Sequence, residues 1–268
     1  MKNLLLLTIV LYYSAKVQAS VPVELDCLVK PEMYVDLSSS TDSVLKRLLV
    51  GPGDKVYKGQ PVVELEASVE RARVELAKQE VDSISEIENR KVQLKYVRSN
   101  NKRIRDLYAK QSTSLFELDK SNTELALAEI ELKKARDRRK VARLRLELAQ
   151  AQLDLKTIQS PIDGIVVDTY VMGGESVADR PIMKLAKINP LRVELIAPTE
   201  YFGLIHPDME VEIQPERPMD KTYKATVSVV DQLIDPASGS FTVRMTLPNL
   251  SDELIGGVNC LARFSWQE

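Results

Sequence analysis

No glycine and no proline occurs between residues 62 and 160, a run of 99 positions in a chain of 268. These two residues disfavour the interior of a helix more than any others, so their absence over such a length favours helix. From Ala67 onward the run is rich in Glu, Lys, Arg, Leu, Ala and Gln, which are good helix formers. The run therefore predicts a long helical segment that separates two parts of the chain.

One short polar segment, residues 110–114, interrupts this helical composition. Ser114 stands three residues before Glu117, which is the spacing of a capping box at the start of a helix. We predict one helix over about 67–110 and a second over about 115–156, each roughly 65 Å long at about 1.5 Å per residue. Two such helices joined by a short turn form an antiparallel hairpin over residues 67–156.

The second predicted helix carries two apolar stripes. The first has the alternating steps of a coiled-coil seam, interrupted only at Arg139, and comprises Leu125, Ala128, Leu132, Ala135, Ala142, Leu146, Ala149 and Leu153. The second lies on nearly the opposite face and comprises Leu127, Ile130, Val141, Leu144, Leu148, Ala151 and Leu155. Because one seam suffices for a two-helix hairpin, the second stripe requires another partner. That partner is a neighbouring copy of the hairpin, another protein's coiled coil, or the β-domain at the base of the hairpin.

A short motif is repeated on either side of the helical run. Its first copy contains Gly53-Asp54-Lys55-Val56 and its second contains Gly174-Glu175-Ser176-Val177, at an offset of 121 positions (174 against 53). The same offset relates Ser43 and Gly164. Each copy has the turn residues of short β-strands and is too small to fold alone. We predict that the two halves, residues 20–66 and 157–188, pair across the base of the hairpin as one small β-sandwich.

Beyond residue 189 the sequence alternates in the manner of β-strands. The candidate strands are residues 192–196, 211–213, 223–230, 241–247 and 259–264, with residues 201–205 as a candidate short helix. Five or six antiparallel strands with a short helix predict a small closed barrel over residues 189–268.

The N-terminus has the features of a secretory signal peptide over residues 1–19. Lys2 precedes an apolar run from Leu4 to Tyr13, and small residues surround a predicted cleavage site after Ala19. The apolar run is too short to span a membrane as a helix. The formal net charge of −2 gives no reason to expect a nucleic-acid partner.

The sequence offers little for catalysis. Its single histidine, His206, stands beside Pro207 in a predicted loop, and no Ser/His/Asp or Cys/His set is recognisable. The phosphate-binding spacings GxxxxGK[ST] and GxGxxG are absent. Cys27 and Cys260 have no CxxC spacing, and in an exported protein they either form a disulfide or remain two buried apolar residues. We therefore expect no enzyme, no cofactor and no metal site.

The order of these segments resembles that of the periplasmic adaptor proteins (membrane fusion proteins, the HlyD-like family) of Gram-negative tripartite efflux pumps. Residues 157–164 are similar to the family's return from the second helix, and residues 235–244 to its barrel signature. The resemblance implies an α+β multidomain fold with a split lipoyl-like β-sandwich, a long antiparallel α-helical coiled-coil hairpin and a small β-barrel. We expect no membrane-proximal domain, and no modified lysine, because the hairpin replaces the loop that carries it in lipoyl carriers.

At the tip of the hairpin this family has an arginine, a leucine four residues later and a serine seven residues beyond that. Arg103, Leu107 and Ser114 have this spacing. The resemblance implies that the tip docks on a TolC-like outer-membrane channel. Leu107 would supply apolar area, Arg103 a charged donor and Ser114 a small hydroxyl that permits close approach.

The resemblance implies a non-enzymatic adaptor in the periplasm, associated with the inner membrane. It would form a trimer or hexamer and bridge an inner-membrane transporter, with the resistance-nodulation-division (RND) class favoured, to the TolC-like channel. An adaptor of an ABC-driven type I secretion or efflux system is the main alternative. A lipoyl- or biotin-type carrier and an exported coiled-coil scaffold are the other two.

Overall fold

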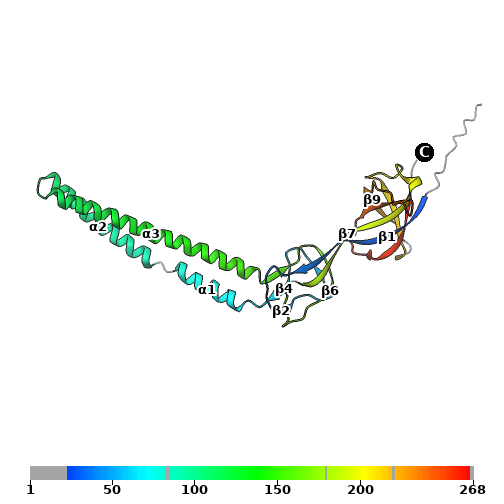
Figure 1. The fold of residues 1–268 in the computed structure, drawn as a ribbon, viewed down its shortest axis with the longest axis horizontal. Helices are drawn as coiled ribbons and strands as arrows, with labels where there is room; N and C mark the ends of the chain where they lie inside the picture. The colour runs from blue at the N-terminus through cyan, green and yellow to red at the C-terminus, as the bar shows by residue number, and fades with distance from the viewer. Residues whose placement is uncertain (1–22, 83–84, 179, 219–220, 266–268) are drawn as a thin grey trace, which may run out of the picture. The chain divides into compact units, whose positions relative to one another are not determined.

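A computed structural model describes residues 23–265, apart from residues 83–84, 179 and 219–220. The predicted signal peptide, residues 1–19, lies outside the described residues. The chain divides into two compact units, one with the residues up to 35 and from 186 onward, and the other with residues 36–185 (Figure 1).

The first unit is a closed β-barrel. Six strands follow one another around it, and the last pairs with the first. In spatial order they are β1 (Val23–Ser38), β11 (Val258–Phe264), β8 (Glu210–Pro215), β9 (Tyr223–Val230), β10 (Ser240–Leu247) and β7 (Pro181–Pro198). Alternate side chains point inward and form an apolar core that includes Val193, Leu195, Ile213, Val243, Met245 and Phe264. The predicted short helix at 201–205 is instead a 3₁₀ turn, η1 (Thr199–Tyr201).

The strand β1 is an element of the barrel that the sequence analysis did not anticipate. Residues 23–29 pair with β11, whereas the sequence was divided so that everything from residue 20 joined the split β-unit. Cys27 lies opposite Cys260 in this pairing, and a disulfide joins the two across 233 positions of sequence. The structure therefore decides between the two states that the sequence left open for these cysteines.

The second unit contains the split β-sandwich. Its first half supplies β2 (Leu45–Leu48), β3 (Lys55–Val56) and β4 (Pro61–Leu65), and its second half supplies β5 (Thr157–Gln159) and β6 (Gly164–Thr169). The halves pair directly, β3 with β6 and β4 with β5, as predicted. Gly53 and Gly174 have φ values of 89° and 93°, so both copies of the repeated motif turn through the left-handed region that glycine allows.

The helical hairpin rises from this sandwich. Its helices are α1 (Ser68–Asp82), α2 (Ser85–Ala109) and α3 (Leu115–Asp154), and α1 and α2 lie in succession along α3 (Figure 1). The range predicted for a single helix, 67–110, is covered by α1 and α2, and residues 83–84 between them lie outside the described residues. The 40 residues of α3 span about 60 Å.

The two apolar stripes of α3 have different environments. The first faces α1 and α2, and Ala128, Leu132, Ala135, Ala142 and Ala149 are buried in it. The second stripe is exposed to solvent, and this holds for Leu127, Ile130, Val141, Leu144, Leu148 and Leu155. The possibility that the second stripe packs on the β-domain is therefore wrong.

At its base the hairpin is tied to the sandwich by Lys156. This lysine follows α3 and is 9% exposed. Its Nζ lies 3.5 Å from the Glu70 carboxylate on α1 and donates to the Ser43 hydroxyl of the first β-half at 3.3 Å. One cation thus links both legs of the hairpin to the β-unit.

None of the described helices combines the length and apolar character that crossing a membrane requires.

Candidate functional site: the tip and flanks of the hairpin

The turn at the tip is fixed by backbone hydrogen bonds. Ser112 donates its N–H to the Leu107 carbonyl at 2.8 Å, and Gln111 donates its N–H to the Tyr108 carbonyl at 2.8 Å. Gln111 has a φ of 58°, a left-handed conformation that often follows the last turn of a helix. This pair of bonds is a Schellman motif, which ends α2 sharply and gives the tip a defined shape.

Ser114 starts α3 as its N-cap. Its hydroxyl oxygen accepts a hydrogen bond from the N–H of Glu117 at 3.2 Å, as the capping spacing predicted. The backbone at Ser114 is extended, with φ −88° and ψ 160°, which is the usual N-cap conformation. Ser114 therefore has a structural role in addition to any contact with a partner.

The three predicted site residues all lie at the tip and face solvent. Arg103 is exposed one helical turn before Leu107, whose side chain is 43% exposed in the last turns of α2. Within the described part of the chain, Arg103 forms no ion pair. No hydrogen bond joins the side chains of Arg103, Leu107 and Ser114 to one another. They are separate exposed groups near the tip.

The tip also carries apolar residues that the sequence analysis missed. Phe116 is 73% exposed and Leu115 57% exposed in the first turn of α3, and Tyr108 is 39% exposed in the last turn of α2. Together with Leu107 these residues form what we call the apolar tip. Two consecutive apolar residues directly after an N-cap, on a helix predicted to project into solvent, were the signal for them.

One polar layer lies just behind the tip. Asn101 and Ser121 are 3% and 5% exposed, and Asn101 Nδ2 donates to Ser121 Oγ at 3.0 Å and to Asn122 Oδ1 at 3.0 Å. Ser121 stands four residues before Leu125, so it extends the first stripe of α3 by one step. The sequence analysis counted only apolar residues in the stripe and therefore missed this layer.

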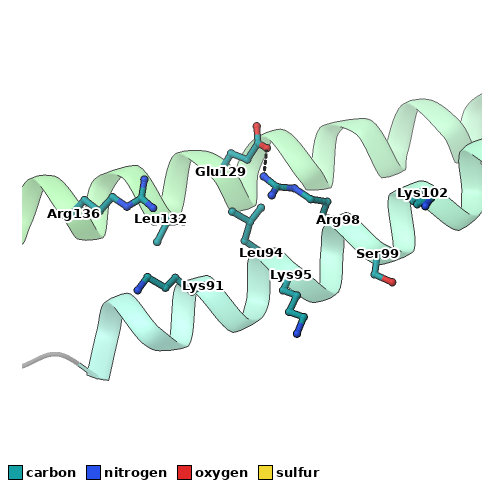
Figure 2. Close-up of a pocket in the computed structure, with 9 residues that line it drawn as sticks. All are labelled: Lys91, Leu94, Lys95, Arg98, Ser99, Lys102, Glu129, Leu132 and Arg136. Carbon is teal, nitrogen blue, oxygen red and sulfur yellow. Dashed lines mark hydrogen bonds and ion pairs between the residues drawn. The ribbon is translucent and has the colours of Figure 1, made fainter.

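A shallow groove runs along one side of the hairpin between α2 and α3. Figure 2 shows the residues that line it, namely Lys91, Leu94, Lys95, Arg98, Ser99, Lys102, Glu129, Leu132 and Arg136. Arg98 forms an ion pair of 3.0 Å with Glu129 across the two helices. The lining holds five cationic side chains and one carboxylate, so this side of the hairpin is strongly basic.

The opposite side of the hairpin carries Glu131. Its carboxylate pairs with Lys134 at 2.9 Å and lies 3.9 Å from Arg90. The hydrogen bond from Lys134 is the main cause that holds the pKa of Glu131 below its usual value, and Arg90 and Arg138 act in the same direction. Glu131 is therefore ionised at neutral pH.

Among the described residues, no three His, Cys, Asp or Glu side chains are placed to hold a metal ion together. The exposed groups of the hairpin are apolar side chains at its tip and charged side chains along its flanks.

A split β-sandwich interrupted by a helical hairpin and accompanied by a closed β-barrel is the fold of the membrane fusion proteins. The sequence is 31% identical over 185 residues to the pyoverdine export membrane fusion protein PvdR of Pseudomonas putida, and this match covers 67% of the chain and 47% of that protein. The PvdR of Pseudomonas aeruginosa is 28% identical over the same length. The chain belongs to the membrane fusion (periplasmic adaptor) proteins, and it spans about half the length of the curated relatives it matches.

Solved structures show the same fold. The crystal structure of MacA from Actinobacillus actinomycetemcomitans superposes with a TM-score of 0.75 at 21% identity, covering 92% of this chain and 79% of that one. The membrane fusion protein Spr0693 from Streptococcus pneumoniae R6 matches with a TM-score of 0.60 at 21% identity, covering 92% and 100% of the two chains. No protein-family model matches the sequence.

Proposed function

We propose that this chain is a periplasmic adaptor that bridges an inner-membrane transporter to a TolC-like outer-membrane channel and so supports export across both membranes. The observation that carries the proposal is the apolar tip. Leu107, Tyr108, Leu115 and Phe116 are exposed at the end of a hairpin whose other end is anchored in a β-sandwich. A rod with an apolar end is suited to docking on another protein.

The apolar tip has a physical reason to bind. Burial of apolar surface contributes roughly 25 cal/mol per Å², so covering two large side chains such as Leu107 and Phe116 contributes several kcal/mol by order of magnitude. Arg103 is a charged donor beside this surface, and it suits carbonyl or carboxylate acceptors at the ends of partner helices. The Schellman turn limits the conformational entropy lost on docking, because the tip is already ordered.

The same proposal covers the organisation of the chain. We assign residues 1–19 to the export signal, 36–66 and 157–188 to the lipoyl-like unit and 67–156 to a coiled-coil hairpin. Residues 23–35 join residues 189–268 in the barrel, since β1 pairs with β11. The buried residues of α3 are separated by three, four or seven residues, which supports a coiled coil. The exposed second stripe supports association with other hairpins in a trimer or hexamer, and the inner-membrane association would come through the transporter.

Substitutions at the tip test the docking. Leu107→Asp and Phe116→Asp place a carboxylate in the apolar tip, and each should abolish cross-linking between a photo-reactive residue at position 112 and the outer-membrane channel in cells, together with export. Leu233→Asp is the matched control, since Leu233 is 85% exposed in the barrel. Unchanged cross-linking and export in both tip variants would rule out the proposed docking site.

For the transporter we propose the RND class, with an ABC-driven system as the alternative. Two of the matched relatives are named for pyoverdine export, so export is the function to test first, ahead of a lipoyl-type carrier or a plain scaffold. Purification of the full chain with its inner-membrane partner, followed by mass spectrometry, decides the class. A co-purified ATP-hydrolysing transporter would replace the RND assignment, and a covalently modified lysine would replace the adaptor assignment.

A further inference from the structure

The two flanks of the hairpin are defined by its interhelical ion pairs. The Arg98–Glu129 pair lies on one flank. The Arg90–Glu131 and Arg138–Glu86 pairs lie on the other. Because the seam between the helices is filled by buried side chains, charges on the two flanks are separated by the body of the hairpin.

The first flank, which we call the basic flank, comprises Lys91, Lys95, Arg98, Lys102 and Arg105 on α2 and Arg136 on α3. The α2 cations are spaced by four, three, four and three residues, so they stay on one side of the helix for its whole length here. Lys91 pairs with Glu88 and Arg98 with Glu129. No ion pair is described for the other four in the resolved part of the chain, so the basic flank retains an excess of positive charge.

The second flank carries a row of glutamates on α3. Glu117, Glu124 and Glu131 are spaced by seven residues, or two helical turns and about 10.5 Å. We call them the acidic row. Glu117 and Glu124 are exposed, and within the described residues no cation pairs with either carboxylate. Lys91, Arg98 and Arg105 on the basic flank have the same spacing of seven.

The two rows also stand at the same heights along the hairpin. Asn101 is hydrogen-bonded to Ser121, which sets residues 101 and 121 level with each other. Because α2 and α3 are antiparallel, Arg105 lies four residues from Asn101 toward the tip, and Glu117 lies four residues from Ser121 in the same direction, so the two are level. Arg98 and Glu124 are level in the same way, each three residues from that layer toward the base. Lys91 adjoins Arg90, which pairs with Glu131, so the third cation and the third glutamate are level too.

We propose that the basic flank of one copy packs against the acidic row of the next, with Lys91, Arg98 and Arg105 facing Glu131, Glu124 and Glu117. The inference rests on the proposed self-association of the adaptor and specifies its contact. Copies in a closed ring are related by rotation alone and have no offset along the ring axis, so groups at the same height meet between neighbours. The two rows have the same period and matching heights on opposite flanks and so satisfy that condition. Glu117 and Glu124 are the carboxylates free to pair with a neighbour, because Glu131 already pairs with Lys134.

A second copy explains these features better than an unrelated acidic partner does, because the complementary row is on the same chain at matching height. The charges also exclude the other ways of pairing hairpins. Basic flank against basic flank, as in a two-fold dimer, places like charges together and is repelled. Head-to-tail contact brings the basic flank to the acidic row, and head-to-tail contacts generate rings when the rotation between copies closes.

Cysteine cross-linking tests the geometry in the full chain in cells. The double variant Arg98→Cys with Glu124→Cys should yield disulfide-linked multimers, while the native Cys27 and Cys260 are already joined to each other. The control, Arg98→Cys with Arg105→Cys, places both thiols on the basic flank. It has no thiol on the acidic row of the neighbouring copy and should therefore give no series of disulfide-linked multimers. If Arg98→Cys instead links to a protein of another mass, the second copy is the wrong occupant.

Charge reversal tests the energetics. The triple variant Lys91→Glu, Arg98→Glu and Arg105→Glu should weaken self-association about tenfold at low salt, since exposed pairs are individually weak but add along a row. Adding Glu117→Lys, Glu124→Lys and Glu131→Lys restores the wild-type net charge and should restore assembly, as measured by sedimentation. Failure of that restoration overturns the proposed contact. The adaptor function itself is tested separately, by the cross-link between the tip and the outer-membrane channel.

Discussion

The side-chain amide of Asn101 on α2 lies 3.0 Å from the hydroxyl of Ser121 on α3, within a seam whose neighbouring buried residues, Leu94, Ala128 and Leu132, are apolar. A buried polar pair of this kind is satisfied in one alignment of the two helices and broken in any other. Polar residues in coiled-coil seams fix register in this way, at a cost in stability. The layer stands close to the tip, so it sets the height of Leu107 relative to Leu115.

We therefore expect the double variant Asn101→Leu with Ser121→Ala to be more thermally stable than the wild type and less active in docking. The apolar pair removes the cost of burying polar groups, but it permits the helices to slip. Thermal unfolding by circular dichroism measures the first effect, and cross-linking of the tip to the channel measures the second. A variant with raised stability and undiminished cross-linking would show that the layer has no registering role.

The left-handed residue in the tip turn gives a second prediction. Gln111 has a φ of 58°, which costs a residue with a Cβ about 1 kcal/mol relative to glycine. Gln111→Gly should raise the free energy of unfolding by roughly 0.5 kcal/mol after its greater entropy in the unfolded chain is included. Urea denaturation measures this change in the free energy of unfolding. Ser112→Gly is the control, because Ser112 does not have a positive φ. A less stable Gln111→Gly protein would contradict the strain assigned to this turn.

Asn249 gives a third prediction, in the barrel. It is 2% exposed, its amide donates to the Ile188 and Leu254 carbonyls at 3.1 Å each, and its Oδ1 accepts from the Leu254 N–H at 3.1 Å. Asn249→Ala leaves these buried backbone groups without partners, which costs about 3 kcal/mol. The exposed Asn259→Ala is the control and should change stability by less than about 0.5 kcal/mol. Equal effects of the two substitutions on the denaturation midpoint would contradict the assignment.

Several elements could be predicted because their signal is local. The β9 strand was predicted at residues 223–230, as observed, because its alternation of apolar and polar residues is clear. The cap at Ser114 follows from a four-residue spacing, and the paired turns at Gly53 and Gly174 follow from an internal repeat. In each case the responsible residues are neighbours in sequence or copies of one another.

Other elements depend on contacts between distant residues. The alternation of Val23, Leu25, Cys27 and Val29 indicates a strand but not the sheet that it joins, and its partner β11 lies more than two hundred residues away. The acidic row was visible as a seven-residue spacing, but its height relative to Arg98 required the register set by Asn101.

The disulfide gives a fourth prediction. Cys27 and Cys260 join strands that lie at opposite ends of the described chain, so the bond closes a very long loop. Cys27→Ala with Cys260→Ala should lower the free energy of unfolding by about 2–5 kcal/mol and leave the barrel folded at room temperature. Denaturation of the wild type and the double variant, each with and without reductant, measures this change in the free energy of unfolding. If reductant shifts the wild-type midpoint no further than that of the double variant, the bond does not form in solution.

The pH dependence of the barrel gives a fifth prediction, through Glu194 on β7. The hydrogen bond from Lys30 on β1 is the main cause that lowers the pKa of Glu194 below its ordinary value, against the opposing effect of burial. A carboxyl whose pKa is lower in the folded state stabilises the fold above its unfolded pKa, about 4.3. That contribution is lost as the pH falls through the folded pKa. The wild-type barrel should therefore lose more stability between pH 7 and pH 3 than the Glu194→Gln variant, in denaturation series at each pH. Parallel pH profiles for the two proteins would show that the Lys30–Glu194 pair contributes nothing to the acid sensitivity of the barrel.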